Sequence, residues 1–161
     1  MSDRLIFLLA LFSVTGSGLI AGLFFAFSSF IMTALARIPN EQGIHAMQSI
    51  NATILNPLFG TLFTGTALTS IVLAVVSIMR WGEPGSLYLL AASLLYLAGF
   101  IVTMAFNVPL NDALAAVDPG SSAGGEVWNN YLRRWVPWNH VRTITSLGAM
   151  ILFVFALRRL N

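Results

Sequence analysis

The residues best suited to chemistry are His140 and Arg142, which stand near each other in the stretch WNHVRT at 138–143. Histidine is the side chain that most readily exchanges a proton near neutral pH, and arginine stays charged and can hold an oxyanion. Pro137 suits the start of a helix that Asn139 could cap, and the positive end of that helix dipole would support Arg142. The pattern predicts a base beside a cation that stabilises an anion such as a phenolate or enolate.

A second histidine and several amide side chains accompany this pair in the connecting segments of the chain. Polar side chains near lipid are unfavourable unless they are hydrogen bonded, and they often mark a functional site. The group consists of His45, Gln48, Asn51, Asn56, Asn107, Asn111, Asn139 and His140. The simpler alternative is a polar rim that ties loops to helix ends. In that case Arg142 would reach lipid headgroups while Trp135 and Trp138 form an aromatic belt.

The two histidines also raise the possibility of a metal or haem site. Glu41 or Asp112 could complete a set of ligands with His45 and His140, although their spacing gives no specific support. The chain has no cysteine, which excludes disulfides, thiolate metal ligands and cysteine catalysis. It also lacks the phosphate-loop and H-E-x-x-H patterns. We expect no metal and no cofactor, with a histidine-ligated metal or haem protein as an alternative.

The composition is that of a membrane protein. Hydrophobic residues make up 57% of the chain and charged residues only 9%, whereas roughly 25% of a soluble domain is charged. All eight basic residues are arginines, and they are scattered along the sequence rather than gathered into a patch. A nucleic-acid partner is therefore excluded. The partners that we expect are the lipid bilayer and a small apolar aromatic molecule, with a homo-oligomer as a further option.

The stretches without charge predict the membrane spans, because a helix needs about 20 apolar residues to cross roughly 30 Å of hydrocarbon. The predicted spans are 5–33, 54–79, 86–106 and 138–157. The last stretch without charge, 143–157, gives only about 22 Å of helix at 1.5 Å per residue. It must therefore recruit the residues before it, which draws Arg142 to the membrane boundary. We predict an all-α, integral membrane four-helix bundle that forms one transmembrane domain over 1–161.

An even number of spans places both termini on one side of the membrane and the connections 37–53 and 107–138 together on the other. Arginines are equally divided between the two sides, and Arg37 is offset by Glu41. We take the termini as cytoplasmic and the location as the bacterial inner membrane. The polar residues then meet at one membrane face.

Short helices are predicted in the first and third connections. Residues 41–52 favour a helix that runs straight into the second span, and 126–136 suit an interfacial helix with aromatic residues at helical spacing. Pro109 has no N–H to donate, so the third span should bend or stop near Asn107 before a short helix.

Several motifs together resemble a known family. They are GLIAGLFFAFSSFIMTAL in the first span, MQSINATILNPLF before the second, NVPLN after the third and WNHVRT before the fourth. Their order resembles the anthrone oxygenase-like, or DUF1772, family of small four-helix membrane proteins. The resemblance covers nearly the whole chain, and it implies oxidation of anthrones by oxygen without an evident cofactor. The residues that match the motifs of the family are Gln48, Asn51, Asn56, Asn107, Asn111, Trp138, Asn139, His140, Arg142 and Thr143.

We therefore predict a membrane oxidoreductase that oxidises a small phenolic, anthrone or quinol-type aromatic without a cofactor. The predicted catalytic residues are His140, Arg142, Asn139 and Asn107. The predicted substrate-binding residues are His45, Gln48, Asn51, Asn56, Asn111, Trp135, Trp138 and Thr143. The expected apolar walls are Phe24, Phe25, Phe27, Phe59, Trp135 and Trp138. The alternative is a non-catalytic membrane subunit, or a protein that binds a quinone or another lipophile.

Overall fold

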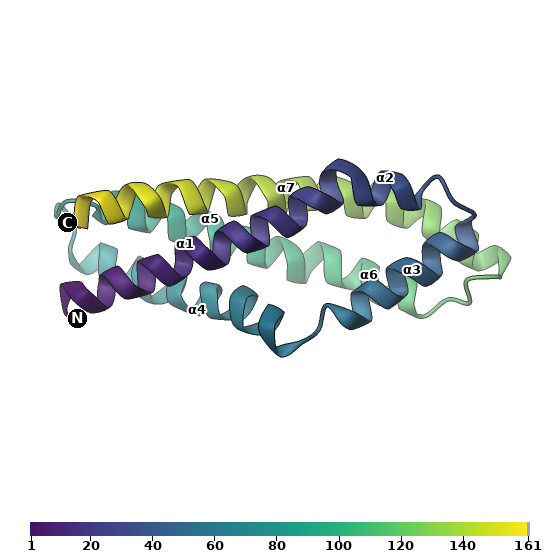
Figure 1. The fold of residues 1–161 in the computed structure, drawn as a ribbon, viewed down its shortest axis with the longest axis horizontal. Helices are drawn as coiled ribbons and strands as arrows, with labels where there is room; N and C mark the ends of the chain where they lie inside the picture. Colours follow the sequence, from purple (N-terminus) through teal and green to yellow (C-terminus); the bar gives the residue numbers. More distant parts are fainter. Residues whose placement is uncertain (161) are drawn as a thin grey trace.

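Four long apolar helices run side by side along one axis of the molecule (Figure 1). The computed structural model describes residues 1–160, and every regular element in that range is helical. The helices that could cross a membrane are Asp3–Leu35, Pro57–Met79, Ser86–Ala115 and Ser122–Leu160. The predicted all-α class and the four spans are confirmed, and the chain is an integral multi-pass membrane protein.

The first span is helical from end to end but changes its winding. It consists of α1 (Asp3–Ala26), a π-helical turn η1 (Phe27–Ile31) and α2 (Met32–Leu35). It packs tightly on the second span at Gly16, where an added Cβ would lie 1.9 Å from Oγ1 of Thr66. Only a glycine allows these two helices to approach so closely.

The second span is separated from the helix that precedes it. The helix α3 (Asn40–Thr53) forms as predicted, but α4 (Pro57–Met79) begins only after a break. Pro57 favours an extended conformation at Asn56, whose φ and ψ are −114° and 163°. The Asn56 side chain then caps α4 by accepting a hydrogen bond from the Phe59 N–H at 3.0 Å. The prediction of one continuous helix is therefore wrong at this point.

The third span continues past Asn107, near which we predicted that it would bend or stop. It consists of α5 (Ser86–Val102), a second π-helical turn η2 (Thr103–Asn107) and α6 (Val108–Ala115). Instead of ending the helix, the chain forms the wider η2 turn just before Pro109, which cannot donate a backbone hydrogen bond. The irregularity predicted near Asn107 is present, but the helix does not end there.

The last span is much longer than its hydrophobic part. The helix α7 (Ser122–Leu160) has 39 residues, about 58 Å at 1.5 Å per residue, and Pro137 lies inside it. The separate interfacial helix predicted at 126–136 is simply its first part. Asn139 is therefore not a helix cap, and the expected contribution of a helix N-terminus to the field at Arg142 is wrong.

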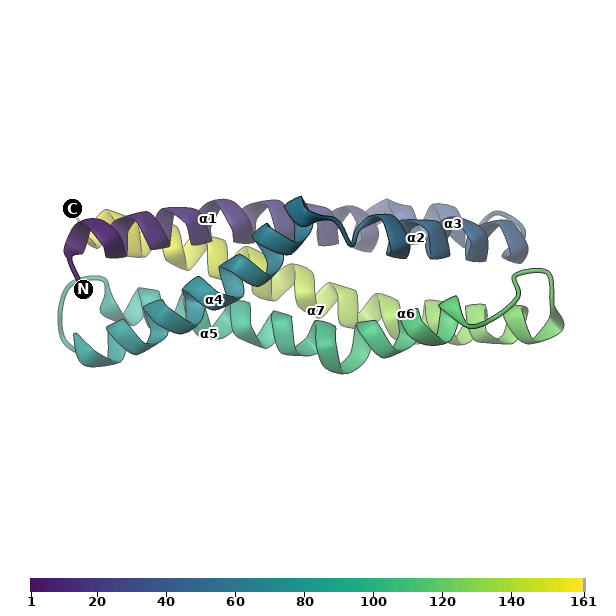
Figure 2. The ribbon, with the colours of Figure 1, turned by 90° about the horizontal axis from the view of Figure 1, so that it is seen from below.

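Both termini lie at one end of the bundle, and the connections after α2 and α6 lie at the other (Figure 1). This is the arrangement predicted from the number of spans. The helix α7 packs along α1 and α5, while α4 crosses them obliquely (Figure 2). Toward the end that carries α3 and α6, the core consists of large side chains, among them Met47, Leu114, Trp128, Tyr131 and Trp135.

Candidate functional site

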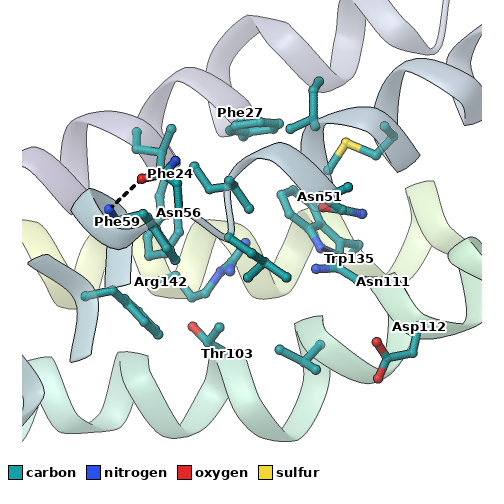
Figure 3. A pocket seen from close by; sticks show the side chains of 18 of the residues that line it. Phe24, Phe27, Asn51, Asn56, Phe59, Thr103, Asn111, Asp112, Trp135 and Arg142 are labelled. Atoms are coloured by element: carbon teal, nitrogen blue, oxygen red, sulfur yellow. Dashed lines mark hydrogen bonds between the residues drawn. The ribbon is translucent and has the colours of Figure 1, made fainter. Parts of the chain in front are cut away.

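A cavity of about 610 Å³ lies where α1, α3, α4, α6 and α7 come together (Figure 3). Its walls are mainly apolar, and aromatic rings from three helices contribute to them. These rings are Phe24, Phe27, Phe59, Phe63 and Trp135. The volume is in the range of pockets that enclose a small organic ligand. The break between α3 and α4 and the two π-helical turns all border this space.

Arg142 is the only basic residue among those that line the cavity. It is 5% exposed, and its Cζ atom lies 4.1 Å from the ring centroid of Phe24 and 4.8 Å from that of Trp135. These cation–π contacts hold the guanidinium between two rings. Both ion pairs found in residues 1–160 belong to Arg80, so no carboxylate of this region neutralises Arg142. A buried cation without an anion is unfavourable, and an anionic ligand would relieve this.

Asn139 orients that arginine. Its Oδ1 accepts a hydrogen bond of 2.6 Å from Nη2 of Arg142. Its Nδ2 donates to the carbonyl oxygen of Phe24 and to Oγ of Ser28, both at 2.8 Å. Thr143 joins the same group, since its Oγ1 lies 3.0 Å from Oγ of Ser28. The first span thereby fixes the direction of the Asn139 amide and, through it, the position of the guanidinium.

Asn111 orients two aromatic side chains of α7, Tyr131 and Trp135, which we call the aromatic wall. Its Oδ1 accepts hydrogen bonds of 2.8 Å from both Oη of Tyr131 and Nε1 of Trp135. The rings of Tyr131 and Trp135 are stacked with centroids 5.6 Å apart. Tyr131 was not predicted as a site residue, although its spacing of one helical turn from Trp135 on α7 could have indicated it.

The amides of α3 and the following break have different roles. Gln48 donates from Nε2 to the carbonyl oxygens of Leu114 and Val117, at 2.9 and 3.1 Å, and so ties α3 to α6. Asn56 caps α4 at the edge of the cavity. Asn51 also lines the cavity, and its buried Nδ2 has no hydrogen-bond partner in the described chain. The Asn51 amide lies close to the Tyr131 hydroxyl, and its Nδ2 can donate to a ligand oxygen in the cavity.

Several predicted residues do not line the cavity. His140 and His45 are both exposed, and Phe25 is 60% exposed. Trp138 stacks on Phe106 with ring centroids 3.8 Å apart. Asn107 is buried against the backbone of α7, where its Nδ2 donates to the Trp135 carbonyl oxygen at 3.3 Å.

The continuous helix explains why His140 and Arg142 are not brought together. Residues one turn apart share a face of a helix, so Arg142 shares its face with Asn139. Adjacent residues point about 100° apart, which turns His140 away from that face. The base and cation expected from WNHVRT therefore do not form one site in this structure.

Thr103 and Asp112 are among the cavity residues that do not belong to the predicted catalytic and substrate-binding sets. Thr103 belongs to η2, and its Oγ1 donates to the Gly99 carbonyl oxygen at 2.9 Å. Asp112 is exposed and is the one carboxylate among the residues that line the cavity. Within residues 1–160, no three His, Asp or Glu side chains gather as a metal site would require.

The comparison with known proteins identifies the family of the chain. A model of the anthrone oxygenase family matches residues 53–152, which extend from the end of α3 through most of α7. The match includes the cavity residues Asn56, Asn111, Asp112, Trp135 and Arg142. No curated protein and no solved structure matches the chain. Because the family match covers well over half of its length, the chain belongs to the anthrone oxygenase family.

Proposed function

We propose that the protein binds a flat, weakly acidic aromatic molecule of the anthrone or phenol type and oxidises it with molecular oxygen. The observation that carries this proposal is the buried guanidinium of Arg142, which faces an apolar cavity without a carboxylate partner. A soluble or fully charged ligand would not suit these walls. An apolar ring system with one acidic hydroxyl would match both the walls and the cation.

Arg142 would stabilise the ionised form of that hydroxyl. A free phenol ionises near a pH of about 10, and a cation in contact with its oxygen favours the anion. The Nε of Arg142 and the Nδ2 of Asn51 are both without a hydrogen-bond partner, so both can donate to ligand oxygens. Phe24 and Trp135 would pack against the faces and edges of the rings.

Asp112 is our candidate for the group that accepts the substrate proton. It lines the cavity, and it is exposed, so it can pass a proton to water. A carboxylate in this position acts as a general base once a substrate carbon or hydroxyl lies within hydrogen-bond reach. His140 and His45 are less suitable because neither side chain lines the cavity.

The reaction balances with oxygen as the only co-substrate. Loss of one proton from the methylene carbon of an anthrone gives an enolate anion, whose electrons reduce oxygen and form a carbon–oxygen bond. The product is a peroxide on that carbon, which takes up a proton. Breaking its O–O bond and the remaining C–H bond releases water and leaves a carbonyl group. One anthrone and one O₂ thus yield one anthraquinone and one water. The protein would contribute mainly by stabilising the anion, and removal of one such donor typically slows a reaction by about 10²–10³-fold.

The test is turnover of emodin anthrone by the purified protein in detergent, with oxygen uptake and quinone absorbance recorded together. A protein-free sample corrects for spontaneous oxidation. We expect equal amounts of oxygen consumed and quinone formed, and a loss of about 10²-fold in kcat/KM for Arg142→Gln. Arg37→Gln is the matched control, because Arg37 is exposed and lies outside the cavity.

Two results would contradict the proposal in different ways. Arg142→Gln as active as the wild type would remove its main support. A wild type that binds the quinone product emodin, but takes up no oxygen with any phenolic substrate, would indicate the non-catalytic lipophile-binding protein instead.

A further inference from the structure

The cavity has a rim of apolar and small residues between α4 and the third span. On α4, Gly60 and Thr64 line the cavity and are exposed, and they lie one turn apart. On the opposite side, Met104 of η2 lines the cavity and is 46% exposed. In Figure 2, α4 crosses α5 obliquely, and its first turns lie toward α1 and away from the third span. We call this rim, formed by Gly60, Thr64 and Met104, the lateral mouth.

The length of α4 indicates the depth of the lateral mouth in a membrane. The helix α4 has 23 residues, about 34 Å at 1.5 Å per residue, so it just spans a hydrocarbon core of about 30 Å. Gly60 and Thr64 are in its first two turns and therefore lie inside the outer part of that core. Arg142 is at a similar depth, since it stands about 24 Å along α7 from Arg158 at the other boundary.

The residues around the lateral mouth support the same placement. Leu55 and Leu58, next to it on the chain, are 79% and 71% exposed. Such exposure of large apolar side chains is favourable in lipid and unfavourable in water. The other side of the cavity is more polar, because Asn51, Asn111 and Asp112 line it there. In Figure 3, Asp112 and Phe59 lie at opposite ends of the pocket.

We propose that the substrate is dissolved in the bilayer and reaches Arg142 sideways, through the lateral mouth between α4 and η2. The inference rests on the proposed function, and it adds the class of substrate: a membrane-dissolved aromatic that never has to cross the aqueous phase. The ring system would slide between the two spans, and its hydroxyl oxygen would meet the guanidinium in the interior. The substrate proton would then leave on the polar side of the cavity, by way of Asp112.

The sequence offers an unusually clean test, because the chain contains no cysteine. A thiol introduced by Gly60→Cys would be the sole target for alkylation. A Cβ at Gly60 meets no atom within 4 Å, so the substitution fits the backbone. Gly22→Cys is the matched control. Gly22 is also an exposed glycine of a membrane span with no atom within 4 Å of an added Cβ, but it does not line the cavity.

The first measurement is the rate of alkylation in liposomes by a lipid-soluble pyrenyl maleimide and by a sulfonated, membrane-impermeant maleimide. We expect Gly60→Cys to react at least about tenfold faster with the lipid-soluble reagent, because the mouth faces hydrocarbon, where the sulfonated reagent does not partition. If the impermeant reagent reacts as fast, the mouth opens to water and the proposal is overturned. This readout does not require turnover.

The second measurement is turnover of emodin anthrone preloaded into the same liposomes, before and after alkylation. For each variant, the turnover before alkylation is the reference for the turnover after alkylation. We expect alkylated Gly60→Cys to lose about tenfold or more in kcat/KM, because a bulky group in the mouth limits access, while alkylated Gly22→Cys keeps its value. An alkylated Gly60→Cys protein with undiminished kcat/KM would overturn the lateral route and leave the proposed function intact. A wild type inactive on this substrate would contradict the proposed function, and the alkylation rates would still decide the route.

Discussion

Arg142 and Asn139 lie one turn apart on α7, and a hydrogen bond of 2.6 Å joins Nη2 of the arginine to Oδ1 of the asparagine. The neutral amide orients the guanidinium without cancelling its charge. A carboxylate at the same position would make the same contact and neutralise the cation. The identity of residue 139 therefore determines whether the cavity retains a free positive charge.

Asn139→Asp should convert this contact into a buried ion pair. We expect the affinity for emodin, an acidic phenol, to fall by about tenfold or more, because the carboxylate competes with the ligand anion. Binding of anthracene, which has no hydroxyl, should change little. Quenching of tryptophan fluorescence in detergent would measure both affinities. An equal loss for both ligands would mean that the substitution disturbs the cavity walls and not its charge.

Asp112→Asn and His140→Ala separate the two candidate bases. We expect Asp112→Asn to lower kcat for emodin anthrone by about 10²-fold, the usual contribution of a general base, and His140→Ala to leave it nearly unchanged. His140 is exposed and does not line the cavity. Oxygen uptake at saturating substrate measures the effect. The opposite order of the two variants would restore the histidine as the base.

Gly16→Ala should destabilise the contact between α1 and α4. The added Cβ would lie 1.9 Å from Oγ1 of Thr66, so we expect a loss of about 1–3 kcal/mol in the free energy of unfolding. Gly22→Ala is the control, because its Cβ meets nothing within 4 Å and alanine favours the helix. Thermal unfolding in detergent compares the two.

A double substitution strengthens that test. Thr66→Ala should recover most of the loss in Gly16→Ala, because it removes the Oγ1 that the added methyl group would meet. Additive losses in the double variant would show that the helices separate for another reason.

Asn111→Leu should loosen the aromatic wall. It removes the shared acceptor of Tyr131 and Trp135 and leaves two buried donors unsatisfied, for which we expect a loss of about 1–3 kcal/mol each. The near-ultraviolet circular dichroism signal of the variant should also weaken, because the stacked rings lose their fixed orientation. Asn56→Asp is a suitable comparison, since it keeps a cap on α4. An unchanged spectrum in Asn111→Leu would mean that stacking alone fixes the rings.

Length and charge predicted the four spans and the common side of the termini. Arg142 was identified as a site residue because a charge so near an apolar span is energetically unfavourable and often marks a functional site. The placement of His140 in one site with Arg142 was wrong, because Pro137 suggested a helix start, whereas packing along α1 and α5 keeps α7 continuous. Asp112 was considered only as a possible metal ligand, because nothing in its local sequence shows that α6 continues the third span and borders the cavity.

The π-helical turns have one more consequence, which concerns rotational register. Each such turn holds one residue more than the α-helical ladder would, so everything beyond it is rotated by about 100° relative to an unbroken helix. In the first span, η1 separates the lipid-embedded part from the part that meets α3, and Ser28 within it contacts Asn139. A single inserted residue can thus set the rotational orientation of the two halves of a span independently. One half then presents its apolar face to the bilayer, and the other half directs its side chains toward the ligand. Deletion of one residue from η1 should rotate one half against the other without shortening the hydrophobic stretch appreciably.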